Sequence, residues 1–227
     1  MPVQPPDRAP RWLQFDRVCS SGGCEARSTM NQDLTFRVVL IGGFLILFPI
    51  AVYHRLKSQA TGERLDRRQE GLVILLTLRP VGVVGMLGLI AYMVSPSWMT
   101  WSSVTLPEWL RWIGVGVGIG AGALLVWTLH SLGRNLTDTV VTRREHVLVT
   151  DGPYRWIRHP FYSSMALAVL ANSLVAANWF LLLTGGLLLV LIVVRTRKEE
   201  ELLLARFGGG YRAYMERTGR FLPRIGA

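Results

Sequence analysis

Cysteine is scarce in this sequence, and its spacing argues against a metal site. Only Cys19 and Cys24 occur among the 227 residues, separated by Ser-Ser-Gly-Gly. No second pair of cysteine or histidine residues follows at the spacing of a tetrahedral zinc site. We therefore expect no bound metal, while a disulfide and two free thiols both remain open.

The sequence also lacks the glycine-rich turn of a soluble nucleotide-binding domain. No Gly-x-Gly-x-x-Gly motif follows a predicted strand, so a Rossmann-type cofactor site is unsupported. Any cofactor pocket must be built from other segments of the chain.

Charged residues are absent from several long stretches, although the chain as a whole is basic. Half of the residues are hydrophobic and the formal net charge is +10. A soluble domain of this length would be less apolar. The basic residues lie between the uncharged stretches and form no continuous basic surface, which argues against nucleic-acid binding and is typical of a membrane protein.

Four apolar segments are long enough for a helix to cross the roughly 30 Å of bilayer hydrocarbon. They cover about residues 34–54, 71–95, 107–130 and 161–194. The last is too long for one crossing, and Ala177-Asn178-Trp179 is its least apolar point, so we expect a turn there. The predicted fold class is an all-α, polytopic integral membrane protein with about five transmembrane helices, the last two forming a helical hairpin.

Glycine recurs in the third apolar segment. Gly114, Gly118 and Gly122 are spaced by four residues, so they lie on one side of a helix. Such spacing lets two helices approach closely. We interpret this pattern as a packing feature.

Lysine and arginine are concentrated in every second segment between or after the predicted spans, and this pattern predicts the orientation of the protein in the membrane. The segments after residues 54, 130 and 194 are basic, whereas residues 96–106 contain no lysine or arginine. The positive-inside rule then places the three basic segments, including the C-terminal tail, in the cytoplasm. The expected location is the inner membrane of a bacterium. The opposite interface is marked by four tryptophans: Trp98, Trp101, Trp109 and Trp112.

Two polar clusters flank the predicted hairpin. The first reads Gly152-Pro153-Tyr154-Arg155-Trp156-Ile157-Arg158-His159-Pro160-Phe161-Tyr162. The second reads Arg195-Thr-Arg-Lys-Glu199-Glu200-Glu201, followed by Phe207-Gly208, Tyr211 and Tyr214. Each alone is typical of a topology anchor or a solvated helix. The hairpin, however, brings both to one membrane boundary, where a cationic cluster faces an anionic one.

The order of these motifs, together with Leu132-Gly133-Arg134-Asn135 and Leu148-Val149-Thr150, resembles the isoprenylcysteine carboxyl methyltransferase family. The resemblance covers about residues 125–224. Related membrane methyltransferases that act on phospholipid amines and small thiols look similar. Ser164 departs from the family, which often has glycine there, and the serine would either narrow the space beside the cofactor or add a hydroxyl group.

The resemblance implies a membrane methyltransferase that uses S-adenosylmethionine. Hydropathy divides the first part of the chain into a polar N-terminal extension at residues 1–33 and three transmembrane helices at 34–130. The resemblance implies a catalytic region at 131–227. The implied cofactor-binding residues are Tyr154, His159, Pro160, Tyr162 and Glu200, and the implied catalytic residues are Arg158, Glu199 and Glu200. A sulfonium zwitterion requires carboxylate, aromatic and cationic groups, and this set contains all three.

The methyl acceptor stays open, apart from its lipophilic or lipid-anchored character. A carboxylate such as that of an isoprenylcysteine would need Arg158 to hold it, whereas an amine or thiol would need a base such as His159 or Glu199. Arg79, His130 and Arg134 are candidates for binding the substrate. Arg79 lies roughly 12 Å into the second span, where an arginine is costly unless it pairs, reaches water or snorkels to the interface.

Two other classes of protein compete with an enzyme. A transporter is disfavoured, because spans one to three have no inverted counterpart in the last two. A non-catalytic membrane scaffold would retain the fold without binding the cofactor. The sequence does not predict an oligomeric state.

Overall fold

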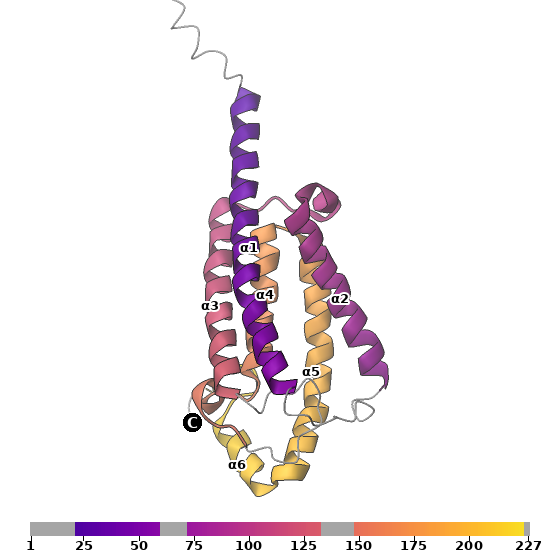
Figure 1. The fold of residues 1–227 in the computed structure, drawn as a ribbon, viewed down its shortest axis with the longest axis vertical. Helices are drawn as coiled ribbons and strands as arrows, with labels where there is room; N and C mark the ends of the chain where they lie inside the picture. The colour runs from indigo at the N-terminus through magenta and orange to yellow at the C-terminus, as the bar shows by residue number, and fades with distance from the viewer. Residues whose placement is uncertain (1–20, 60–71, 133–147, 225–227) are drawn as a thin grey trace, which may run out of the picture.

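The computed structural model describes residues 21–59, 72–132 and 148–224. These ranges form six α-helices and two short 3-10 helices, with no strand among them: α1 Ser21–Gln59, α2 Leu72–Val94, η3 Pro96–Ser102, α3 Glu108–Leu132, η5 Gly152–Arg155, α4 Pro160–Ala176, α5 Trp179–Phe207 and α6 Gly209–Arg217. Figure 1 shows α1 to α5 running along the long axis, with η3 at one end and α6 at the other.

The predicted all-α membrane fold is confirmed in the described part of the chain. Four helices are long and apolar enough to cross a membrane, over Asp33–His54, Leu76–Val94, Glu108–Leu132 and Trp179–Phe207. The fifth, α4, is apolar but has only 17 residues. Its length of roughly 25 Å falls short of the roughly 30 Å of hydrocarbon, so α4 alone is too short to span it.

The turn between α4 and α5 forms where the sequence predicted it. Ala177 is left-handed, with a φ of 47°, and ends α4. Asn178 then caps α5, because its Oδ1 accepts hydrogen bonds from the amides of Phe180 and Leu181. The Nδ2 of the same side chain donates to Ser102 Oγ at 2.8 Å, so the cap also ties the hairpin to η3.

Asn178→Ala is expected to lower the free energy of unfolding by about 2 kcal/mol. The substitution removes the cap of α5 and the bond donated to the fully buried Ser102 hydroxyl, which keeps its own bond to Met99 O. Thermal unfolding in detergent measures the effect. Asn178→Asp, which keeps the capping oxygen and loses the donated bond, should be affected about half as much. An unfolding temperature equal to that of the wild type in Asn178→Ala would contradict this role.

The glycines of α3 let it pack closely against two helices. A Cβ atom at Gly114 would lie 2.8 Å from Leu174 Cβ of α4, closer than real Cβ atoms approach. Gly118 faces α4 as well, while a Cβ at Gly122 would lie 3.2 Å from the Leu47 side chain of α1. The close approach predicted from the spacing of four is therefore confirmed.

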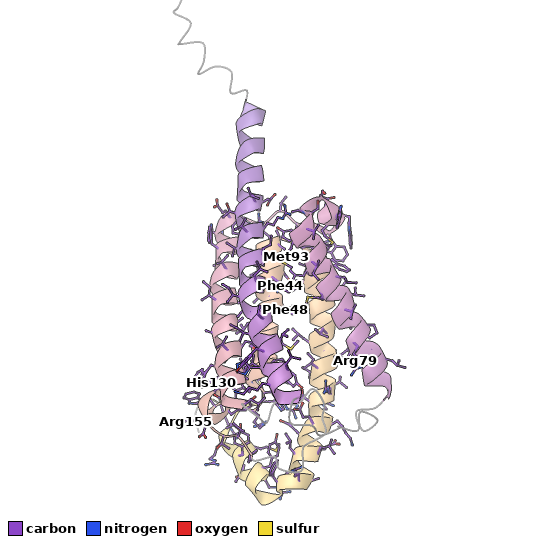
Figure 2. The ribbon with its side chains drawn as sticks, in the orientation of Figure 1. Phe44, Phe48, Arg79, Met93, His130 and Arg155 are labelled. Atoms are coloured by element: carbon purple, nitrogen blue, oxygen red, sulfur yellow. The ribbon has the colours of Figure 1, made fainter. Side chains whose placement is uncertain are left out.

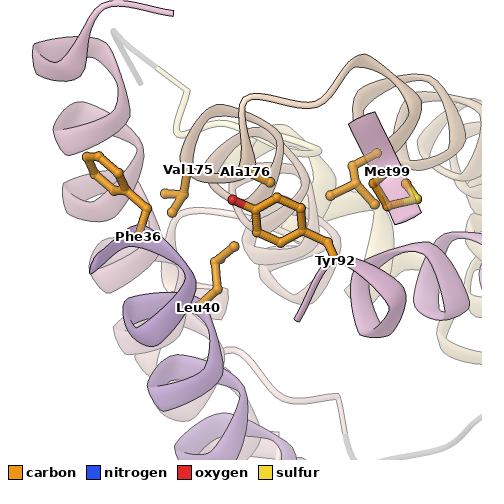
Figure 3. Packing of buried hydrophobic residues seen from close by; sticks show 7 residues of the cluster. Phe36, Leu40, Tyr92, Met99, Val175 and Ala176 are labelled. Carbon is orange, nitrogen blue, oxygen red and sulfur yellow. The ribbon is translucent and has the colours of Figure 1, made fainter. Parts of the chain in front are cut away.

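The buried hydrophobic core lies at the η3 end of the bundle, where five elements meet (Figure 3). Its members are Phe36, Leu40, Tyr92, Met99, Val175, Ala176 and Leu181. Arg111 joins three helices there, because its Nε donates to Val175 O at 3.0 Å and its Nη1 pairs with Asp33 at 2.7 Å. This packing fixes one end of the α4–α5 hairpin and leaves the other end to carry polar groups.

Two helices extend beyond their apolar segments. α1 begins at Ser21, inside the polar extension that the sequence predicted through residue 33, and α5 continues past Val194 as far as Phe207. Hydropathy marks only the apolar part of a helix, whereas Glu, Arg and Lys are good helix formers and prolong it. Cys19 lies outside the described residues, so the structure leaves the state of the two thiols open.

Candidate functional site

The loop before α4 is held in place by α3. Gly152 has a φ of +61°, and a Cβ there would lie 2.2 Å from Ser131 Oγ, so both the backbone conformation and the lack of space require glycine. Trp127 and Trp156 pack edge to face, with ring centroids 5.8 Å apart. Pro160 then starts α4 at its first helical position. The loop is therefore fixed at both ends.

Glu200 is the centre of an ion-pair network at the base of the hairpin. Arg158 Nε donates to its Oε1 at 3.0 Å, and Arg220 pairs with its Oε2. His159 Nε2 lies 3.4 Å from Oε1 without the alignment of a hydrogen bond. The Glu200 side chain is only 6% exposed. The structure thus brings together the arginine, the histidine and the carboxylate that the sequence placed at one boundary.

The three consecutive carboxylates occupy three different environments. Glu199 accepts a hydrogen bond from the Tyr162 hydroxyl, with 2.9 Å between the oxygens. Glu200 is buried in the network, whereas Glu201 is exposed and pairs with Lys198 at 3.3 Å. The sequence did not distinguish these positions, because successive helical residues point about 100° apart and the orientation of α5 was unknown.

Three tyrosines pack around this network from η5 and α6. The Tyr214 hydroxyl donates to Tyr154 O at 2.6 Å, and the Tyr211 and Tyr214 rings lie 5.9 Å apart. Burial raises the pKa of Tyr214 to about 12 and the pKa values of Tyr154 and Tyr211 above their usual range. All three hydroxyls are therefore protonated at neutral pH, where they serve as hydrogen-bonding groups and not as bases.

Of the three candidates for substrate binding, only Arg79 and His130 lie among the described residues. Arg79 is exposed on α2, on the opposite side of the bundle from His130 and Arg155 at the foot of α3 (Figure 2). His130 is also exposed. Arg134 falls outside the described residues. The structure therefore does not join Arg79 to His130, and the substrate-binding roles of all three residues stay predictions.

The departure at Ser164 is explained by local bonding. Its hydroxyl donates to Phe161 O at 2.7 Å, within the first turns of α4, and the residue is buried. The serine therefore adds a hydroxyl that is satisfied inside its own helix.

Sequence reasoning missed Arg220 and the segment around it. In the sequence, Arg220 is one of several arginines in a basic tail, and that pattern indicates topology only. The structure pairs it with Glu200, and this hydrogen bond raises the pKa of Arg220 above its usual value. The one local signal in the sequence was Gly219, because a glycine that no helical pattern follows indicates a turn.

An apolar groove lies on α5, far from these residues. It is formed by Trp179, Leu182, Leu183, Gly186 and Leu187. Trp179 and Glu200 are separated by roughly 30 Å along the helix at 1.5 Å per residue. This groove belongs to the lipid-facing side of α5 and is not part of the polar network.

Comparison with known proteins bears on the family and on the fold. Residues 113–205 match the model of the isoprenylcysteine carboxyl methyltransferase (ICMT) family. Among solved structures, the chain is similar to the eukaryotic intramembrane Ras methyltransferase ICMT (isoprenylcysteine carboxyl methyltransferase), solved without a monobody, with a TM-score of 0.50 and 20% identity over 84% of this chain and 68% of that chain. A search of curated proteins found no match.

The matched region starts and ends earlier than the resemblance in the sequence, which extended to about residue 224. It contains the first polar cluster and the segment from Arg195 to Glu201 of the second, but it excludes Phe207-Gly208, α6 and Arg220. At 20% identity, the solved structure supports the fold alone. The resemblance predicted from the sequence is confirmed: residues 113–205 match the model of the isoprenylcysteine carboxyl methyltransferase family, and the helical fold is similar to that of the solved structure.

Proposed function

We propose that this chain is an S-adenosylmethionine-dependent methyltransferase that transfers a methyl group to a lipophilic acceptor such as an isoprenylcysteine carboxylate. It lies in a bacterial inner membrane, with α6 on the cytoplasmic side. The observation that carries the proposal is the ion pair between Arg158 and Glu200, which joins residues 42 positions apart inside the region that matches the family. When bound, the cofactor supplies an electrophilic methyl group on a sulfonium.

The residues near Glu200 fit this cofactor. His159 Nε2 and Tyr211 Oη are buried and have no hydrogen-bond partner among the described residues. Buried polar atoms are normally bonded, so two such atoms beside one carboxylate are consistent with a polar ligand at this position. The amino-acid part of the cofactor offers both a carboxylate and an ammonium group for them to contact.

Glu199 and Tyr162 suit the cationic part of the cofactor. Tyr162 donates to Glu199, and its ring stacks on His159 with centroids 5.5 Å apart. A carboxylate beside aromatic faces favours a positive charge such as a sulfonium or an ammonium. We therefore assign these residues to cofactor binding, with Tyr154 and Pro160 shaping the wall through η5 and the start of α4.

Arg158 suits an anionic acceptor. Its Nε is used by Glu200, and its Nη1 by the backbone carbonyls of Met215 and Thr218. Its Nη2 bonds to no residue that the structure describes. Because the guanidinium is a rigid fork of five N–H donors, the two donors on Nη2 are held in a fixed direction and left for a ligand. This arrangement favours a carboxylate acceptor, since methyl transfer to an ionised group requires alignment and no base.

The proposal is tested by titrating the purified protein in detergent with S-adenosylhomocysteine in a calorimeter. A methyl-transfer screen then compares a farnesylated cysteine, a phosphatidylethanolamine and a small thiol. We expect saturable binding, and turnover on the farnesylated cysteine. Tyr162→Phe, which removes one hydrogen bond to Glu199, should weaken binding about fivefold. Folded protein that does not bind the ligand would refute the enzyme and favour a scaffold.

A further inference from the structure

The residues after α6 form a strap, Thr218–Leu222, that pairs with the loop before α4. Gly219 and Ile157 form a short parallel β-bridge. The amides of Arg158 and His159 donate to the carbonyls of Gly219 and Arg220 at 2.9 and 3.0 Å. The backbone on both sides of the Arg158 side chain is thus fixed by the strap.

The strap is also packed too tightly to shift freely. A Cβ atom at Gly219 would lie 1.8 Å from Leu222 O, so the chain turns back on itself where only glycine fits. Ser163 Oγ of α4 donates to Phe221 O at 2.6 Å. The Phe221 and His159 rings are 6.0 Å apart. The strap therefore covers the beginning of α4.

Arg220 reaches Glu200 from this strap. It pairs with Oε2, while Arg158 uses Oε1, so each oxygen of the carboxylate is held by a different arginine. The Arg220 side chain is 35% exposed and that of Arg158 only 10%. Arg220 thus fixes the carboxylate from the more open side, and Glu200 in turn fixes the buried guanidinium.

We propose that the strap is part of the active site and that Arg220 is a positioning residue, which holds Glu200 so that Glu200 orients Arg158 toward the methyl acceptor. Its charge contributes as well. Two arginines around one glutamate leave the cluster with one net positive charge, which attracts an anionic acceptor, whereas a cluster without Arg220 is neutral. The acceptor role rests on the proposed function, but the positioning by the strap does not.

Kinetics of the full-length protein test the effect on the acceptor. Arg220→Ala should raise the KM for the acceptor about tenfold, while the affinity for S-adenosylhomocysteine stays within about threefold. Arg220→Lys keeps the positive charge but not the planar guanidinium, so its KM for the acceptor should lie between those of the wild type and Arg220→Ala. Arg212, exposed on α6, is the matched control, and Arg212→Ala should behave as wild type.

The outcomes separate positioning from a loss of folding. A wild-type KM in Arg220→Ala would overturn the proposal, as would equal losses in acceptor and cofactor binding. If Arg220→Ala is not recovered in a folded form, Arg220→Gln replaces it in the experiment, because glutamine has a similar length and no charge. A wild-type KM for the acceptor in Arg220→Gln would likewise overturn the proposal.

Hydrogen exchange tests the strap without any methyl transfer. In wild-type protein the amides of Arg158 and His159 should be protected by their bonds to the strap, and Arg220→Ala should speed their exchange, whereas Arg212→Ala should not. Unchanged exchange would overturn the positioning by the strap. Hydrogen exchange could become faster in Arg220→Ala while the wild-type protein methylates no acceptor. In that case the proposed function is wrong, and the positioning of the Arg158 backbone by the strap is still supported.

Discussion

Glu200→Gln is expected to abolish nearly all methyl transfer and to lower the free energy of unfolding by about 3 kcal/mol. The carboxylate is shared by Arg158 and Arg220, and removing one partner from a buried ion pair leaves uncompensated charge. A glutamine also directs an amide N–H₂ group toward a guanidinium, and both are donors. Thermal unfolding in detergent, followed by initial rates of methyl transfer, measures the two effects.

The neighbouring carboxylates provide matched controls on the same turn of α5. Glu201→Gln removes only an exposed pair with Lys198 and should change stability by less than about 0.5 kcal/mol. Glu199→Gln keeps an acceptor for Tyr162 and should remain folded, with weaker binding of S-adenosylhomocysteine. If Glu200→Gln behaves like Glu201→Gln, the network is only a solvated part of the helix.

Arg158→Lys should reduce turnover by at least about a hundredfold, although the charge is retained. A single ammonium group cannot replace the guanidinium, which bonds to Glu200 and to the carbonyls of Met215 and Thr218 together. Affinity for S-adenosylhomocysteine should stay within a few fold, because the proposed function assigns the remaining donors of Arg158 to the acceptor. Single-turnover rates and calorimetric titration measure the two quantities.

Arg155 is the control for this substitution, since it lies in the same motif but is exposed and rests over the Trp156 ring. Arg155→Lys should have nearly normal turnover. If cofactor binding and turnover fall in parallel in Arg158→Lys, the arginine belongs to the cofactor pocket and not to the acceptor.

The hairpin was predictable because its signals are local. The apolar segment 161–194 is too long to cross the bilayer as a single helix, and Asn178 can cap a second helix at the least apolar point of the segment. The same hairpin predicted that Arg158 would lie beside the Glu199-Glu200 pair. Which of the adjacent glutamates would point at Arg158 depends on the rotation of α5, and the packing of α5 against α2 and α4 sets that rotation.

The strap was not predictable because its contacts are long-range and carry no periodic pattern. Arg220 looks like any other arginine of a basic tail, and its partner lies 20 positions away on α5. Similarly, the polar beginning of α1 and the charged end of α5 carry no apolar periodicity that would set their bounds. In both cases hydropathy marks only the apolar part of a helix and not its polar end.

The pairing of Gly219 with Ile157 also sets an order of assembly during biosynthesis. Every candidate span ends by Phe207, so insertion into the bilayer requires no residue of the strap. Arg158, however, gains its backbone acceptors at Met215 and Thr218 only after those residues have left the ribosome. A chain that ends before residue 215 therefore contains all of the candidate spans, but its Arg158 guanidinium lacks both of these backbone acceptors.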